Sequence, residues 1–142
     1  MAASTTSQVQ NALNLVMTMK PGMQAGITAA GPQLMDKIRS GADAIGTLHD
    51  ARFVQLNDNT VGLFTTYDGD LDTYVMDFTK HLGDVFDLLL PHTIDSPPLP
   101  VEKNVQAFID WVRVHDLPSV SGVYSAYPTL SVQDIRALAA KG

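Results

Sequence analysis

The chain has 142 residues, a formal net charge of −6 and no cysteine. Its 45% hydrophobic and 17% charged residues are typical of a globular domain. The lack of cysteine excludes disulfides and cysteine nucleophiles, and fits a reducing, cytoplasmic location. The nine Lys and Arg residues are scattered in an acidic chain, so we expect no nucleic-acid partner. No apolar run approaches the roughly 20 residues of a membrane span, so we expect no membrane partner.

The N-terminal part predicts a tail and a strand. Residues 1–8 are small and polar, and we expect them to form a flexible tail before a single domain over residues 9–142. Apolar side chains alternate imperfectly over residues 9–20, which predicts a strand that a Pro-Gly pair ends.

A helix and a hairpin are expected next. Apolar residues recur at helical spacing over residues 23–45, and Gly31-Pro32 is expected to break or kink this helix because proline cannot donate the interior hydrogen bond. Two β-type runs, roughly residues 47–56 and 61–67, flank a short polar turn. This pattern is typical of a β-hairpin.

The clearest element is an amphipathic helix after the hairpin. Acidic residues crowd its start, where the helix dipole favours negative charge, and Pro91 ends it. Its apolar stripe recurs every three or four residues and consists of Leu71, Tyr74, Val75, Phe78, Leu82, Val85, Phe86 and Leu89.

The C-terminal part predicts three further elements. A proline-rich loop over residues 94–100 leads into a helix over residues 101–115. Residues 119–127 form a last β-type run, closed by proline. Residues 131–134 (Ser-Val-Gln-Asp) are a capping sequence that opens a short C-terminal helix.

This order of elements predicts the ferredoxin-like α+β fold, a split βαβ arrangement. We expect a four-stranded antiparallel sheet with helices on one face, an extra helix before the last strand and a C-terminal helix. The other face of the sheet then needs a cover. A symmetric homodimer through that face is the simplest solution for a chain this apolar.

The chain resembles the dimeric α/β-barrel superfamily, in an uncharacterised bacterial branch. The resemblance rests on element order and on three short motifs, at residues 19–23 (Met-Lys-Pro-Gly-Met), 49–54 (His-Asp-Ala-Arg-Phe-Val) and 67–70 (Tyr-Asp-Gly-Asp) followed by Tyr74. It implies a dimer of two ferredoxin-like units and a small-molecule cavity between sheet and helices. Relatives by fold include cofactor-independent monooxygenases, polyketide cyclases and haem proteins, so the resemblance does not choose one chemistry.

Three polar residues inside the first hairpin strand are the candidate catalytic group. His49 suits a general base near neutral pH, Arg52 an anion or oxyanion partner, and Asp50 an ion-pair partner of Arg52. On a regular strand Asp50 and Arg52 share one face and His49 points to the other. A structural alternative is a local hydrogen bond of His49 and an ion pair that fixes strand register.

Aromatic and amide side chains are the candidate substrate-binding residues. Tyr67 or Tyr124 could position a phenol, quinone or carbonyl oxygen, although surface-directed core tyrosines would give the same pattern. Asn14 lies on the polar side of the first strand, at a cavity wall, a dimer interface or a wet surface. Phe53 and Phe64 complete this set.

His81 is the candidate haem ligand, because it lies at the edge of the apolar helical stripe. A solvent-facing histidine at that edge is the alternative. Asp77 and His81 stand at i, i+4, but two ligands are too few for a metal, so we expect none.

Nucleotide-binding, nucleophile-elbow and zinc motifs are absent from the sequence. We therefore expect a small enzyme without nucleotide cofactor, a cyclase or monooxygenase that acts on an aromatic or polyketide-like molecule. Two alternatives remain open, a non-catalytic ligand-binding or accessory protein and a haem-binding, peroxidase-like protein.

Overall fold

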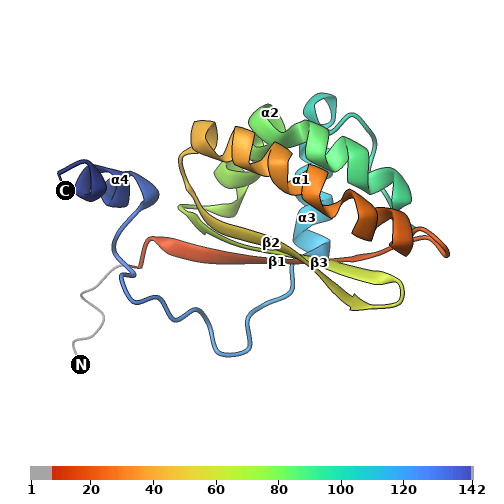
Figure 1. Cartoon of the computed structure of the whole chain (residues 1–142), viewed down its shortest axis with the longest axis horizontal. Coiled ribbons are helices and arrows are strands. Elements are labelled where there is room, and N and C mark those ends of the chain that lie inside the picture. Colours follow the sequence, from red (N-terminus) through yellow and green to blue (C-terminus); the bar gives the residue numbers. More distant parts are fainter. Residues whose placement is uncertain (1–7, 142) are drawn as a thin grey trace.

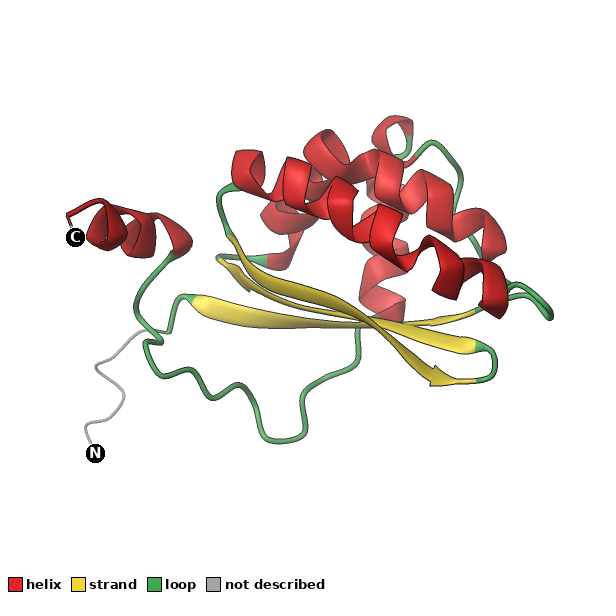
Figure 2. Cartoon of the chain, in the orientation of Figure 1, coloured by secondary structure: helices red, strands yellow, loops and turns green. Residues whose placement is uncertain are grey.

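A computed structural model describes residues 8–141. The expected tail, except for Gln8, lies outside the described residues, and the division into a tail and one domain stays a prediction. The antiparallel sheet has the order β1-β3-β2 and consists of β1 (Gln10–Thr18), β2 (Leu48–Asn57) and β3 (Thr60–Asp68). The helices on one face of it are α1 (Gln24–Ile45), α2 (Leu71–Leu89) and α3 (Val105–His115) (Figures 1 and 2). The prediction of an α+β fold with helices on one face is confirmed.

The hairpin has the strands predicted for it and a tighter turn. The strands extend to Asn57 and Thr60, which leaves a two-residue turn of Asp58 and Asn59. The side-chain oxygen of Asn57 accepts the N–H of Asn59 at 3.1 Å. Asparagine suits this position because its short side chain can bond its own backbone two residues on.

The sheet buries one face against the helices. Leu15 of β1 pairs with Leu63 of β3, and both are fully buried on the helix side. The next residues along each strand point to the opposite face, as the two-residue period requires. Between sheet and helices the core contains a row of aromatic rings in successive contact, namely Tyr67, Tyr74, Phe78, Phe86, Phe108 and Trp111, followed by His115.

The first helix runs through its proline. α1 is continuous, with Pro32 inside it, so the expected break is absent. The hydrogen bond that Pro32 cannot donate would go to the carbonyl of Thr28, an exposed residue, where water can replace it. Gly31 has no Cβ to clash with the proline ring, which relieves the usual restriction on the preceding residue.

The second helix is confirmed over its predicted length. Asp70 caps its start by accepting the N–H of Thr73 at 3.0 Å, and this bond holds the pKa of the Asp70 carboxyl below its usual value. The backbone leaves helical geometry at Leu82, where φ is −133°. At this point α1 approaches closely, because a Cβ on Gly41 would lie 2.7 Å from the carbonyl oxygen of His81.

The predicted fourth strand is wrong. Residues 119–127 form no strand, and the described sheet has three strands. A turn reverses the chain within this run, since the N–H of Gly122 bonds the carbonyl of Ser119 at 3.3 Å and Gly122 has a φ of +73°. Prolines 118 and 128 lie on either side of the run and have no N–H for a ladder. The segment bonds β1 at its two ends, and between them it lies on the side of the sheet away from the helices as an irregular connection (Figure 2).

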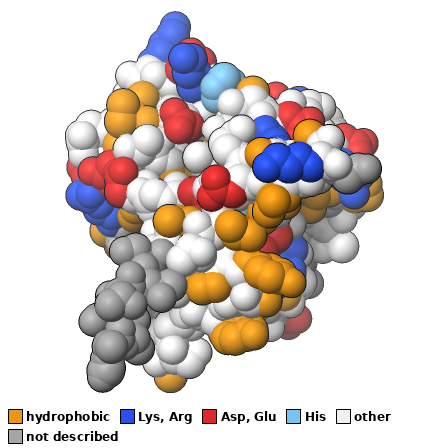
Figure 3. Space-filling model, turned by 90° about the vertical axis from the view of Figure 1, so that its left-hand side faces the viewer, with side chains coloured by type: hydrophobic (Ala, Val, Ile, Leu, Met, Phe, Trp, Pro, Cys, Tyr) orange, Lys and Arg blue, Asp and Glu red, His pale blue; other side chains and the backbone are white. Residues whose placement is uncertain are grey.

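The C-terminal helix, α4 (Val132–Lys141), is confirmed with its cap. The Ser131 hydroxyl accepts the N–H of Asp134 at 3.1 Å, and the Asp134 carboxylate accepts the N–H of Ser131 at 3.0 Å. Figure 1 shows α4 at one end of the molecule, and there Arg136 of α4 pairs with Asp43 near the end of α1 at 3.3 Å. Figure 3 shows orange hydrophobic side chains among charged ones at this end of the molecule. None of the helices within residues 8–141 combines the length and apolarity needed to cross a bilayer.

Candidate functional site

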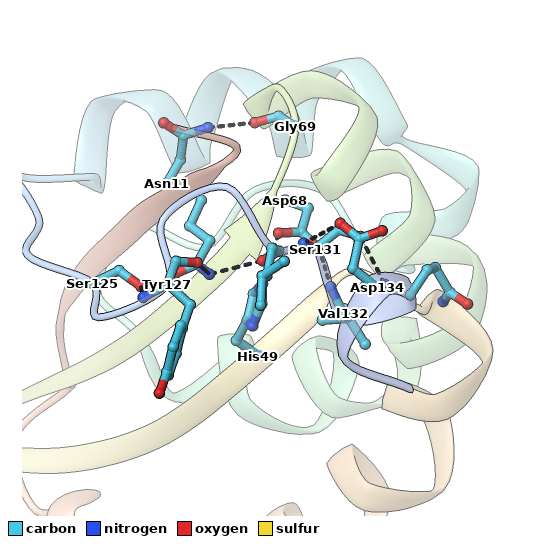
Figure 4. A network of polar contacts seen from close by, with 12 residues as sticks. Asn11, His49, Asp68, Gly69, Ser125, Tyr127, Ser131, Val132 and Asp134 are labelled. Atoms are coloured by element: carbon cyan, nitrogen blue, oxygen red, sulfur yellow. Dashed lines mark hydrogen bonds and ion pairs between the residues drawn. The ribbon is translucent and has the colours of Figure 1, made fainter. Parts of the chain in front are cut away.

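His49 bonds an aspartate, but a different one from its sequence neighbour. Its Nε2 lies 2.6 Å from Oδ1 of Asp68, and the two side chains are 12% and 10% exposed. The pairing register shifts between Leu48 and Asp50, so β2 holds one extra residue there. This bulge interrupts the alternation of the strand and allows His49 to reach Asp68 at the end of β3 (Figure 4).

The same carboxylate also anchors α4. Oδ2 of Asp68 accepts the N–H of Val132, the first residue of that helix, at 2.8 Å. The side-chain amide of Gln133 donates to the carbonyl of Gly46 at 2.9 Å. These bonds join the base of the hairpin to the C-terminal helix. They favour the structural alternative for His49, whose catalytic role stays a prediction.

Asp50 and Arg52 share a face, as the strand period predicts, but the structure does not bury them. Both are exposed, and these two described residues form no ion pair with each other. The Arg52 guanidinium carbon lies 5.8 Å from the centre of the Phe64 ring, a cation–π contact. Arg52 and Phe64 pair across β2 and β3, on the face away from the helices.

A pocket of about 480 Å³ lies along the outer edge of β1. Its volume falls in the range typical of small-molecule sites. Its lining includes Tyr67 and Asn14, both predicted substrate-binding residues, together with Gln10, Ala12, Asp116 and Ser119. The pocket occupies the space beside β1 that the predicted fourth strand would have filled, between the strand and the irregular segment after α3.

Among the described residues that line the pocket, Asp116 is the one carboxylate, and sequence reasoning missed it. It follows α3 directly, and its Oδ1 accepts the N–H of Asn14 at 2.9 Å. Burial raises the pKa of the Asp116 carboxyl, although the bond from Asn14 acts in the opposite direction. A signal for it does exist in the sequence, because an aspartate at a helix C-terminus opposes the helix dipole.

Tyr67 lines the same pocket. The residue is 5% exposed, and its ring stacks on Tyr74 with centroids 4.2 Å apart. Burial raises the pKa of the Tyr67 hydroxyl, and the negative charges of Asp116 and Asp70 raise it further. The hydroxyl therefore stays protonated at neutral pH and can donate a hydrogen bond to a ligand oxygen.

The structure does not bring the other predicted substrate-binding residues into this pocket. Phe53 lines a separate apolar pocket of about 160 Å³ between α1 and the hairpin. Tyr124 is 91% exposed on the irregular segment, so its ring contacts little of the protein. Phe64 lies on the open face of the sheet, as described above.

His81 does not enter an apolar pocket. It is exposed and lines a groove of about 290 Å³ between α1 and α2, where Lys37 and Asp84 form an ion pair at 3.0 Å. A charged, open groove lacks the apolar enclosure that haem needs. Within residues 8–141, no three His, Asp or Glu side chains come together as a metal site.

Comparisons with known proteins add little. No family model and no curated protein match the sequence. Among solved structures, a protein from Chloroflexus aurantiacus J-10-fl described as an antibiotic biosynthesis monooxygenase resembles the chain at 12% identity and a TM-score of 0.43. The likeness covers 60% of this chain and 82% of the other. A similarity of this size carries no argument about the activity of this protein.

Proposed function

We propose that the chain binds a small polar molecule in the pocket at the β1 edge and transfers a proton on it. Asp116 acts as the acid or base, and Tyr67 donates a hydrogen bond to a hydroxyl or carbonyl oxygen. The observation that carries the proposal is that Asp116 and Tyr67 both line this pocket. Burial raises the pKa of both groups. Perturbed ionisable groups in a concave site are typical of acid–base catalysts.

The chemistry expected at this site is modest. A carboxyl whose pKa is raised towards neutrality can exchange protons with a ligand more readily than a solvated aspartate. Asn14 supports the site by holding Asp116 through its backbone N–H, while its side-chain amide donates to the carbonyl of Leu117 at 2.9 Å. We also propose that the substrate is an aromatic or polyketide-like molecule and that turnover requires no nucleotide cofactor.

Binding is tested by NMR titration with 2-naphthol and with pentane-2,4-dione, a minimal β-dicarbonyl. We expect amide shifts at Asn14, Asp116 and Ser119, and a loss of affinity in Tyr67→Phe. Tyr124→Phe is the matched control, because it removes the same hydroxyl from an exposed ring. Shifts confined to another surface, or equal behaviour of the two variants, would overturn the proposed site.

Proton transfer is tested in D₂O with pentane-2,4-dione. The protein should accelerate deuterium exchange at the carbon between the two carbonyls. The Asp116→Asn variant should still bind pentane-2,4-dione but should not accelerate the exchange. Binding without exchange in the unaltered protein would instead identify a non-catalytic ligand-binding protein.

The proposal includes a homodimer through the open face of the sheet. Helices cover only the opposite face (Figure 2). Val16 and Phe64 lie on the face without helices, and Leu56 lies next to Gly62 on that face. Leu56→Lys should shift the protein to a monomer in light scattering. Leu138→Lys on α4 is the control, since both leucines are similarly exposed. A monomeric unaltered protein would refute the dimer.

A further inference from the structure

Among residues 8–141, the outer edge of β1 has backbone groups without a partner. Asn14 directs its N–H to Asp116 and accepts the N–H of Leu117 at 2.9 Å, so both of its backbone groups face away from β3. In an antiparallel ladder, the backbone N–H and C=O groups of every second residue point to the same edge of the strand. Ala12 therefore also presents its N–H and C=O to the outer edge. Within residues 8–141, no partner outside the sheet is found for either group.

The edge is closed on both sides of Ala12. Towards the C-terminus of β1, Leu117 occupies the carbonyl of Asn14. Towards the N-terminus, the N–H of Val9 bonds the carbonyl of Pro128 at 3.0 Å, and the side chain of Gln8 occupies the carbonyl of Gln10 at 3.0 Å. The distance from residue 10 to residue 14 is about 14 Å at the usual strand rise. Only three or four residues of extended chain fit such a gap.

The connecting segment leaves this gap hollow. Residues 117–128 bridge the two closed ends with more chain than the distance needs, and the turn at Gly122 bows them outwards. Ala12 and Gly122 both line the resulting pocket. A strand edge beside an open pocket is the geometry that binds peptides by strand addition.

Charge fixes a direction for such a peptide. A chain antiparallel to β1 runs from the Asn14 end towards the Gln10 end, so its amino terminus lies at Asn14. Asp116 lies at that same end and is the one carboxylate among the described residues of the wall. A protonated α-amino group there would gain a charge-assisted hydrogen bond.

We propose that this pocket binds a tri- or tetrapeptide with a free amino terminus, antiparallel to β1, with its second residue paired to Ala12 and its amino group on Asp116. The inference rests on the pocket of the proposed function and assigns it a second class of ligand, beside the aromatic or polyketide-like molecules named there. It requires no proton transfer by the protein.

The test is an NMR titration of the ¹⁵N-labelled full chain with Ala-Ala-Ala-amide. We expect the Ala12 amide to shift most. Two matched peptides isolate the two interactions. Acetylation of the amino terminus removes the charge facing Asp116, and N-methylation of the second residue removes the donor to the Ala12 carbonyl. Each change should weaken binding about tenfold or more, as expected for the loss of one such hydrogen bond.

Variants test the site from the protein side. Ala12→Pro removes the outward N–H without removing a β1–β3 ladder bond, so the sheet should remain and peptide affinity should fall. Tyr124→Phe is the control outside the pocket. If Ala12→Pro does not fold, the modified peptides on the unaltered protein still decide the question.

The outcomes separate the two proposals. Equal binding of all three peptides, or peptide shifts that spare Ala12, would overturn the peptide assignment. If 2-naphthol still binds in a Tyr67-dependent manner, the proposed function stands without the peptide assignment. If neither ligand class shifts the residues of the pocket, both proposals fail.

Discussion

The two sides of β1 differ sharply in how they are packed. On the helix side, Leu13 and Leu15 are buried among the aromatic rings of α2 and α3, and Met17 is buried in the same core. At the outer edge, a few hydrogen bonds at Asn14 and Val9 hold an irregular, exposed segment around a hollow pocket. The first region gains its free energy from apolar burial, whereas the second gains little and keeps polar groups available. Stability and ligand binding are therefore expected to respond to different residues.

The largest effect should come from emptying the aromatic row. Phe108 is 1% exposed and contacts Phe86 and Trp111. Phe108→Ala removes its contacts and leaves a cavity, which should lower the free energy of unfolding by about 3–5 kcal/mol. Tyr124→Ala, on the exposed segment, should cost less than about 0.5 kcal/mol. Urea denaturation measures both, and equal losses would contradict the division between the two regions.

The next effect tests the crossing of α1 and α2. Gly41→Ala would force a Cβ against Leu82 and the backbone of His81, so we expect a loss of about 3 kcal/mol. Gly26→Ala is the matched control in the same helix, because no atom lies within 4 Å of its added Cβ. Alanine there should stabilise the protein by up to about 1 kcal/mol. Thermal unfolding of the two variants should therefore shift in opposite directions.

A smaller effect is expected where α4 joins the hairpin. His49→Ala leaves Asp68 with Val132 as its one partner from this network, at a cost of about 1–2 kcal/mol. Amide hydrogen exchange at Val132 should accelerate more than exchange in α2. Asp50→Ala, at the neighbouring exposed residue, should change neither the free energy of unfolding nor the amide exchange at Val132. Loss of turnover in His49→Ala with unchanged stability would restore the catalytic assignment.

The smallest effect is a pH dependence at the pocket. Burial raises the pKa of Asp116 above its usual value of 3.8, so the folded state holds this proton more tightly than the unfolded state. The contribution of Asp116 to the free energy of unfolding therefore falls as the pH rises from 3.8 through the raised pKa. Above the raised pKa this contribution is constant. Asp116→Asn keeps an oxygen acceptor for Asn14 but cannot titrate.

The difference in unfolding free energy between the original protein and Asp116→Asn should decline across this window. A difference that stays constant or grows with pH would show that the carboxyl is not held in its protonated form by the fold.

Local patterns were sufficient for most of the fold. The hairpin, α2 and the cap of α4 depend on neighbouring residues, through turn chemistry, a 3.6-residue stripe and a capping sequence. The predicted strand at residues 119–127 had β-type composition, but pairing also requires a straight backbone beside β1. The turn at Gly122 and the two flanking prolines prevent it.

The site was less predictable, because its residues meet only in three dimensions. Tyr67 and Asn14 were identified by type and lie in one pocket, on neighbouring strands. Asp116 is more than 100 positions from Asn14 in sequence, at the end of another helix. The contact between His49 and Asp68 depends on a bulge at residues 48–50, which simple strand alternation does not predict.

The exposed connection before α4 has a consequence for proteolysis. Chymotrypsin prefers to cut after large aromatic residues, and Tyr124 is both exposed and followed by serine rather than proline. A single cut there would divide the chain into a long fragment and a short one that carries α4. The bonds from Asp68 to Val132 and from Gln133 to Gly46 would still hold the two fragments together. The protein would then migrate as one species under native conditions and as two after denaturation.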